Sequence, residues 1–162
     1  MAIFLEYEGV KGSATEQNHI GWIQVDSMQW GCGRGIGGTQ AGAAQGREAS
    51  LASLSEVTIT KPMDGSSYDF LKEATTGAVP GKKVVIEHVT VGAGNQADKT
   101  FKYELEECMV SGYSISSGGD RPSESVSLNF TKITYEIAQG AVDGVLQDPK
   151  IGWYDLAQAK GG

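Results

Sequence analysis

The feature that most constrains the fold of this 162-residue chain is an alternation of apolar and polar side chains with a period of two. Phe101, Tyr103 and Leu105 alternate with charged residues. Successive side chains of a strand point to opposite faces, so this pattern predicts a strand with one buried and one wet face. Between Val84 and Val89 both sets of positions are partly apolar, which predicts burial on both faces. Antiparallel β-sheet is therefore predicted for much of the chain.

The alternation changes phase at three places. Apolar residues occupy even positions up to Phe130 and odd positions from Ile133, and similar changes occur within 25–28 and 105–108. A β-bulge near residues 131–132 would absorb the extra residue and bend the strand. Long, bulged strands favour a curved sheet that closes. We therefore predict a mainly β fold, an antiparallel β-barrel of two curved sheets, for residues 1–162 as a single domain.

One short helix is predicted among the strands, at residues 66–77. Ser66 or Ser67 is placed to cap its first turn, and Gly77 is placed to end it in the left-handed conformation. Pro80 then prevents the helix from resuming. We expect this helix to cover one opening of the barrel.

The segment 31–49 shows no periodic pattern of apolar residues, because it is rich in glycine and Ile36 is its large apolar side chain. A long loop with little to bury is usually functional or disordered. We predict a glycine-rich arm that protrudes from the barrel and becomes ordered on a partner. Residues 33–38 also match G-x-G-x-x-G, but a dinucleotide site needs a βαβ unit that antiparallel alternation does not supply, so no cofactor is expected.

Charge and hydropathy argue against two classes of partner. The chain has 20 acidic and 13 basic residues, a net charge of −7 that repels nucleic acid and anionic lipid. Apolar runs are far shorter than the roughly 20 residues that span a bilayer, so no membrane insertion is expected. The first eight residues carry acids where a secretory signal carries basic residues. We expect a protein made in the cytoplasm and, if exported, secreted without a cleaved signal peptide.

Residues able to carry chemistry are few. Cys32 and Cys108 form no C-x-x-C pair and have no cluster of histidines near them in sequence, so we expect two free thiols and no metal site. His19 and His88 are the only histidines, and no nucleophile elbow occurs. We predict that the chain is not an enzyme. For each of the three tryptophans, a place in the core is the favoured interpretation.

Several short motifs follow one another along almost the whole chain. They are Gly9–Gly12, Trp22–Trp30 with Gly31 after it, the glycine-rich arm, Val57–Lys61 with Asp64 and Ser66, the E-x-V-x-L-x-F segment Glu124–Phe130, and Ile151–Leu156, which is similar to a "GGWDL" motif. In this order the motifs resemble the Hcp (haemolysin-coregulated protein) family of type VI secretion. The chain departs from the family at Tyr68, where proline is common, and at the inserted Tyr154.

The resemblance implies a structural subunit of the type VI inner tube. Such proteins form hexameric rings that stack into a tube, are expelled when the surrounding sheath contracts, and carry effectors in the ring lumen. The implied partners are further copies of the chain, sheath and spike proteins, and effector proteins. The candidate ring-stacking and interface residues are Gly31, Arg34, Gly35, Arg47, Glu48, Trp153 and Asp155. Two alternatives stay open: a β-barrel that binds a lipid or sugar, and an enzyme that holds a phosphate-bearing cofactor in the glycine loop.

Overall fold

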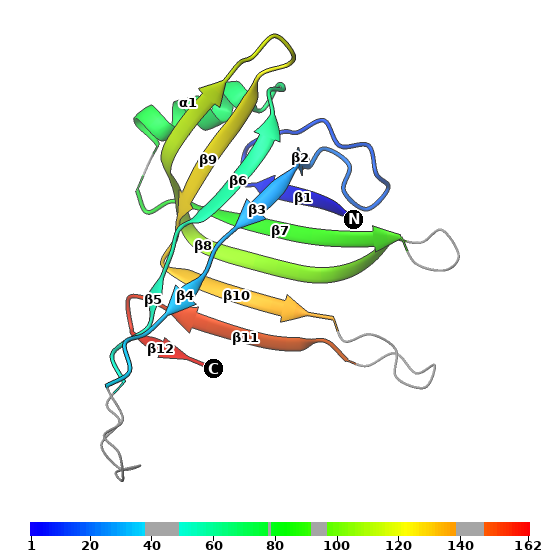
Figure 1. The fold of residues 1–162 in the computed structure, drawn as a ribbon. Coiled ribbons are helices and arrows are strands. Elements are labelled where there is room, and N and C mark those ends of the chain that lie inside the picture. Colours follow the sequence, from blue (N-terminus) through cyan, green and yellow to red (C-terminus); the bar gives the residue numbers. More distant parts are fainter. Residues whose placement is uncertain (38–48, 78, 92–96, 139–147) are drawn as a thin grey trace.

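The computed structural model describes residues 1–37, 49–77, 79–91, 97–138 and 148–162. Two curved layers of strands share one long strand, and a single helix lies beside one end of them (Figure 1). The elements in chain order are β1 (Ala2–Tyr7), β2 (Ile23–Val25), β3 (Ser27–Gln29), β4 (Cys32–Gly33), β5 (Ser53–Leu54), β6 (Val57–Pro62), α1 (Ser67–Thr76), β7 (Lys82–Val91), β8 (Ala97–Ser116), β9 (Ser123–Asn129), β10 (Lys132–Ile137), β11 (Lys150–Asp155) and β12 (Lys160–Gly161).

Antiparallel ladders join the strands, and β8 belongs to both layers. The large sheet has the order β12-β11-β10-β8-β7-β1-β2, and the small sheet has the order β8-β9-β6-β3. β8 pairs with β7 as far as Cys108 and with β9 from Met109 onward. The predicted mainly β, antiparallel architecture with one short helix is therefore confirmed.

The predicted barrel is not closed. Within the described residues, β2 and β12 are the outermost strands of the large sheet, and no ladder joins them. The reason is the shortness of β2: after three residues the chain leaves the large sheet, and β3 pairs with β6 in the small one. The fold is an open pair of curved antiparallel sheets.

Each predicted phase change lies where the chain passes from one sheet to the other. Between β2 and β3, the N–H of Asp26 donates to the carbonyl of Thr60 at 2.8 Å. Within β8, Glu107 has a φ of 51°, and the ladder to β7 shifts register beside it. The bulge predicted near Thr131 is instead a break, because β9 ends at Asn129 in the small sheet and β10 begins in the large sheet.

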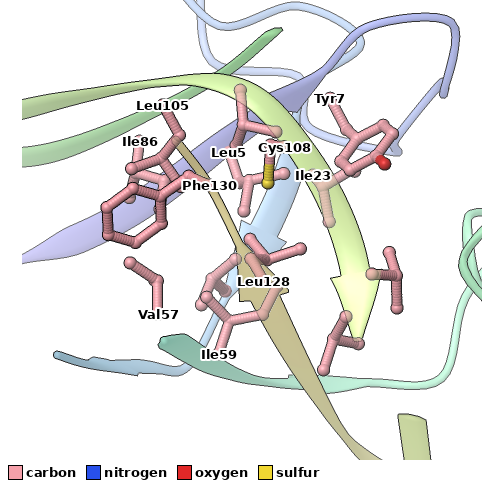
Figure 2. Close-up of a cluster of buried hydrophobic side chains, with 14 of the residues drawn as sticks. Leu5, Tyr7, Ile23, Val57, Ile59, Ile86, Leu105, Cys108, Leu128 and Phe130 are labelled. Carbon is pink, nitrogen blue, oxygen red and sulfur yellow. The ribbon is translucent and has the colours of Figure 1, made fainter. Parts of the chain in front are cut away.

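The core lies between the inner faces of the two sheets (Figure 2). Burial of one large apolar side chain stabilises a fold by about 1.5–3 kcal/mol, so this cluster supplies most of the stabilising free energy. Its labelled members are Leu5, Tyr7, Ile23, Val57, Ile59, Ile86, Leu105, Cys108, Leu128 and Phe130.

Helix α1 covers one end of this core. Its Phe70 is fully buried and meets the ring of Tyr7 edge-on at 5.6 Å between centroids. The helix ends within a residue of its predicted bounds, but Gly77 has φ −58° and ψ 141° and is not left-handed. Its N–H donates to the carbonyl of Glu73 at 3.0 Å, and a Cβ there would lie 2.4 Å from that oxygen. Close approach, rather than a special φ, therefore favours glycine at this position.

A buried polar network fixes the start of α1 to the small sheet. Lys61 is fully buried, and its Nζ lies 2.8 Å from Glu124 Oε2 and 2.9 Å from Asp64 Oδ1. Tyr113 donates its hydroxyl to the other oxygen of Glu124. Ser66 does not cap the helix through its side chain, since both its N–H and its hydroxyl donate to Asp64. The aspartate therefore organises the turn that precedes the helix.

Candidate assembly surfaces

Part of the predicted arm is regular structure. β4 and β5 pair antiparallel, and together with their flanking residues they form a two-stranded ribbon of residues 31–36 and 49–55, called here the ribbon, which extends away from both sheets (Figure 1). At its base, Gly31 donates its N–H to the hydroxyl of Ser55 at 2.8 Å. Farther out, Gly35 donates to the hydroxyl of Ser50 at 2.7 Å, and Ile36 bridges to Ala49. The chain therefore leaves the sheets and returns along a hydrogen-bonded path.

The arm's candidate interface residues differ in their surroundings. Gly31, Arg34 and Gly35 are exposed on the ribbon, while Arg47 and Glu48 lie outside the described residues. A Cβ added at Gly31 would meet nothing within 4 Å, whereas one at Gly35 would lie 3.2 Å from the hydroxyl oxygen of Ser50. Packing against the described residues thus gives no reason for glycine at position 31.

Trp153 lies half-buried on β11 rather than in the core. The Nζ of Lys132 sits 5.1 Å from its ring centroid, and its backbone exchanges two hydrogen bonds with Gly162. Asp155 accepts hydrogen bonds from the N–H groups of Ala157 and Gln158 at 2.9 and 3.1 Å. Asp155 therefore shapes the turn between β11 and β12, and Trp153 keeps an exposed edge.

Two recesses bring the ribbon and Trp153 to the same end of the molecule. A groove of about 310 Å³ separates the base of the ribbon from β11 and β12, and Trp153 forms part of its apolar lining. An open recess of about 870 Å³ runs along the ribbon past Arg34 and Gly35. Trp30 and Cys32 line both recesses. This end of the molecule, together with the bordering strand β11, therefore carries five of the candidate residues: Gly31, Arg34, Gly35, Trp153 and Asp155.

The outer face of the small sheet, called here the hydroxyl face, carries no charge within its ladders. Its inner positions on β6, such as Ile59, are buried, so the alternating positions Thr58 and Thr60 point outward. The charged residues Asp26 and Glu56 come directly before β3 and β6 and lie outside these strands. Cross-strand register gives the members of this face as Ser27, Gln29, Thr58, Thr60, Gly112, Ser114, Ser125 and Ser127.

The outer face of the large sheet, called here the charged face, differs sharply from the hydroxyl face. Lys102 Nζ lies 2.8 Å from Glu104 Oε1, and this hydrogen bond, with Glu87 and Glu136 nearby, raises the pKa of Lys102. Longer ion pairs of 3.8–3.9 Å join Lys132 to Glu106 and Lys83 to Glu104. The members are Glu6, Lys83, Glu87, Lys102, Glu104, Glu106, Lys132, Glu136 and Asp155.

Groups able to carry chemistry are sparse in the described part of the chain. No cluster of three or more His, Cys, Asp or Glu there is placed to hold a metal ion. Gly33 pairs antiparallel with β5, whereas the glycine loop of a dinucleotide site joins a strand to a helix in a parallel βαβ unit. Cys32 is exposed, whereas burial raises the pKa of Cys108 to about 12. No helix of the described residues is long and apolar enough to cross a bilayer.

One polar site escaped the sequence analysis. His19 is 4% exposed and lies between Glu16 and Glu87, with its Nε2 2.8 Å from Glu87 Oε2. Glu87 follows His19 by 68 residues, so no local pattern could have joined them. The other histidine, His88, is a packed ring that contacts Phe101 and Tyr103 edge-on.

Comparisons with known proteins agree with this architecture. A family model described as "Type VI secretion system effector, Hcp" matches residues 4–137. A type six secretion system protein of known structure is 23% identical, with a TM-score of 0.85 and 99% of each chain covered. Hcp1 from Salmonella typhimurium is 21% identical, with a TM-score of 0.75 over 99% of this chain and 97% of that one. A type VI secretion system effector from Yersinia pestis is 18% identical, with a TM-score of 0.72 over 94% and 98%.

The structural and family matches support different conclusions. No curated protein matches the chain. Sequence identities of 18–23% to the solved structures establish the fold, and the family model spans most of the chain. A lipid- or sugar-binding barrel is not favoured by these matches. The chain belongs to the type VI secretion system effector family Hcp.

Proposed function

We propose that the chain is a non-enzymatic structural subunit of the type VI inner tube, which forms hexameric rings that stack and are expelled when the sheath contracts. The observation that carries this proposal is the ribbon, because beyond Leu54, which packs against the core, it extends away from its own subunit. Ile36 and Leu51 on it are 55% and 73% exposed. Apolar side chains held out on a hydrogen-bonded ribbon suit contact with another subunit.

Two different interfaces are needed to make rings and then a tube. A heterologous interface closes a ring by rotation, and a second interface along the axis gives an open-ended stack. We assign the arm, residues 31–49, to the axial contact, with Arg34, Arg47 and Glu48 as charged groups that pair with the next ring. Trp153 and the groove beside it are assigned to the contact between neighbours within a ring, where aromatic side chains commonly carry the binding free energy.

The two outer faces suit different surroundings in such a tube. We assign the hydroxyl face to the lumen, because an uncharged surface does not select passing effectors by the sign of their charge. The charged face then turns toward the sheath, and the spike caps the end of the stack. Hydroxyl groups still offer hydrogen bonds to a bound effector.

Substituting Thr58 by Arg should leave rings intact and weaken effector retention.

The first test is the mass of the purified protein by light scattering, with negative-stain images of the same peak. A mass about six times the 17.1 kDa of the chain, in particles with an open centre, is expected. A compact monomer that binds an apolar probe would contradict the proposal and favour a ligand carrier.

The axial role of the arm has its own test. Residues 36–49 are replaced by a short turn that preserves the hydrogen bonds at the base of the ribbon. Folding and ring mass should be unchanged, while tube growth seen by electron microscopy should be lost. Substitution of Trp153 by Ala should give the opposite result, folded subunits without rings. Loss of folding in the arm variant would show instead that the arm stabilises its own subunit.

A further inference from the structure

Residues 11–22, called here the N-terminal loop, fold back on themselves between β1 and β2 (Figure 1). The N–H of Gly12 donates to Gly21, the N–H of Ala14 donates to Trp22, and that of Gly21 returns to Ala14, all at 2.8–2.9 Å. These bonds close the loop but tie it only to itself and to the start of β2. Ala14 and Trp22 pack against Phe4 and Val89 of the sheet, and the side chain of His19 supplies a polar link to Glu87 on β7.

His19 packs onto the charged face of the large sheet. Its ring stacks on Phe4 at 4.5 Å between centroids and meets Trp22 edge-on at 4.8 Å. Phe4 and Glu87 are direct cross-strand neighbours on β1 and β7, so both present their side chains to the same face. The Nε2 of His19 lies 2.8 Å from Glu87 Oε2, and its Nδ1 contacts Glu16 of the same loop.

These two contacts depend on the protonation state of the ring. A neutral imidazole has one N–H and one lone pair, whereas the imidazolium has two N–H donors. Two ionised carboxylates, one at each nitrogen, are therefore both satisfied only by the imidazolium. The hydrogen bond from His19 is also the main cause that lowers the pKa of Glu16.

The other groups around His19 do not remove this requirement. Phe4 from β1 and Trp22 from the start of β2 present neutral rings. From β8, Lys102 lies near Glu87, and from β10 Glu136 lies near Lys102, so the neighbouring strands add one cation and one further acid. Neither group reaches the ring nitrogens with a hydrogen bond in the described structure.

We propose that His19 is a proton-dependent latch, which as an imidazolium holds the N-terminal loop against the large sheet and releases it when the ring loses its proton to solvent. The loop covers a second hydrophobic cluster, in which Phe4, Ala14 and Val89 are buried and Trp22 packs beside them. Opening the latch therefore uncovers apolar surface at the edge of the sheet. The latch is independent of whether rings form, because all its groups belong to one chain.

The charge state is tested directly by nitrogen NMR of the two imidazoles in the full chain. While the loop is closed, both ring nitrogens of His19 should carry protons, because each faces a carboxylate. His88 is the internal comparison, because burial lowers its pKa and its Nε2 has no hydrogen-bond partner among the described residues. A neutral His19 ring at pH 7, with the loop closed, would overturn the proposal.

The coupling to the loop is tested by amide hydrogen exchange of Ala14, Gly21 and Trp22, relative to the core amide of Ile86. His19→Gln keeps a donor but cannot satisfy both carboxylates, so exchange in the loop should be about tenfold faster or more, with Ile86 unchanged.

The matched control is His88→Gln, which should leave the loop amides unchanged. If His19→Gln does not fold, the wild-type chain is followed as the pH is raised, after correction for intrinsic exchange. Protection of the loop should then fall while that of Ile86 persists. Equal protection at all pH values, or equal effects of the two substitutions, would refute the latch.

Discussion

At the scale of single residues, Lys61 shows how the fold holds a buried charge. It is fully buried with Glu124, and its ammonium group also contacts Asp64. A buried ion pair is weak evidence for net stability, yet removal of one partner is costly because the other charge stays uncompensated. The sequence analysis placed Lys61 only at the end of a motif shared with the Hcp family, and nothing nearby in the sequence pointed to its partner, since Glu124 lies 63 residues later. Local sequence patterns thus do not predict this polar pairing.

Replacement of Lys61 by Met tests this network. The substitution keeps most of the apolar stem but leaves Glu124 buried without its cation, so the free energy of unfolding should fall by about 3–5 kcal/mol. Urea denaturation measures the change. The matched control is Lys83→Met, whose side chain is 57% exposed and 3.9 Å from Glu104. That control should cost about 0–1 kcal/mol, and similar losses in both variants would contradict the assignment.

The same network predicts how stability depends on pH. Burial acts to raise the pKa values of Asp64 and Glu124, but hydrogen bonds, including those from Ser66 and Lys61, outweigh it and hold both below their ordinary range. A carboxyl with a lowered folded pKa stabilises the fold above its unfolded value, about 4, and loses that contribution as the pH falls through the folded value. Unfolding free energy should therefore decline below about pH 4, and less steeply in Glu124→Gln. An unaltered slope in that variant would argue against the role of Glu124.

At the scale of elements, the three phase changes were readable in the sequence, but their meaning was not. The alternation shows only that a strand changes its buried side, and either a bulge or a passage between sheets can cause that change. The choice depends on partners far along the chain, such as β6 for β3. For the same reason the ribbon was not predicted: the hydrogen bond between Gly31 and Ser55 spans 24 residues and involves no apolar period.

The corner at which Gly81, just before β7, meets the bend of β8 at Glu107 gives an element-scale prediction. Gly81 has a φ of +108°, and a Cβ there would lie 2.6 Å from the backbone of Glu107. Gly81→Ala should therefore lower the free energy of unfolding by about 2 kcal/mol or more. Gly65→Ala is the control, because its Cβ would meet nothing within 4 Å and its φ is not positive. Comparable thermal unfolding of the two variants would show that this corner relaxes easily.

At the scale of the whole molecule, charge decides how copies approach one another. Six subunits of net charge −7 would bring 6 × −7 = −42 to each proposed ring. The screening length falls from about 30 Å at 0.01 M salt to about 8 Å at 0.15 M, so ring stacking should strengthen as salt is added. Sedimentation at the two salt concentrations measures this. Tubes that come apart in salt would instead indicate that ion pairs, such as those assigned to Arg34, dominate the axial contact.

The shared strand β8 has a consequence for how the subunit unfolds. It is an interior strand of the large sheet and the first strand of the small one, so neither layer can lose it without disrupting the other. The two sheets should therefore melt as one cooperative unit, with no intermediate that keeps a single layer. A subunit with this property stays intact up to one threshold of mechanical load instead of yielding layer by layer.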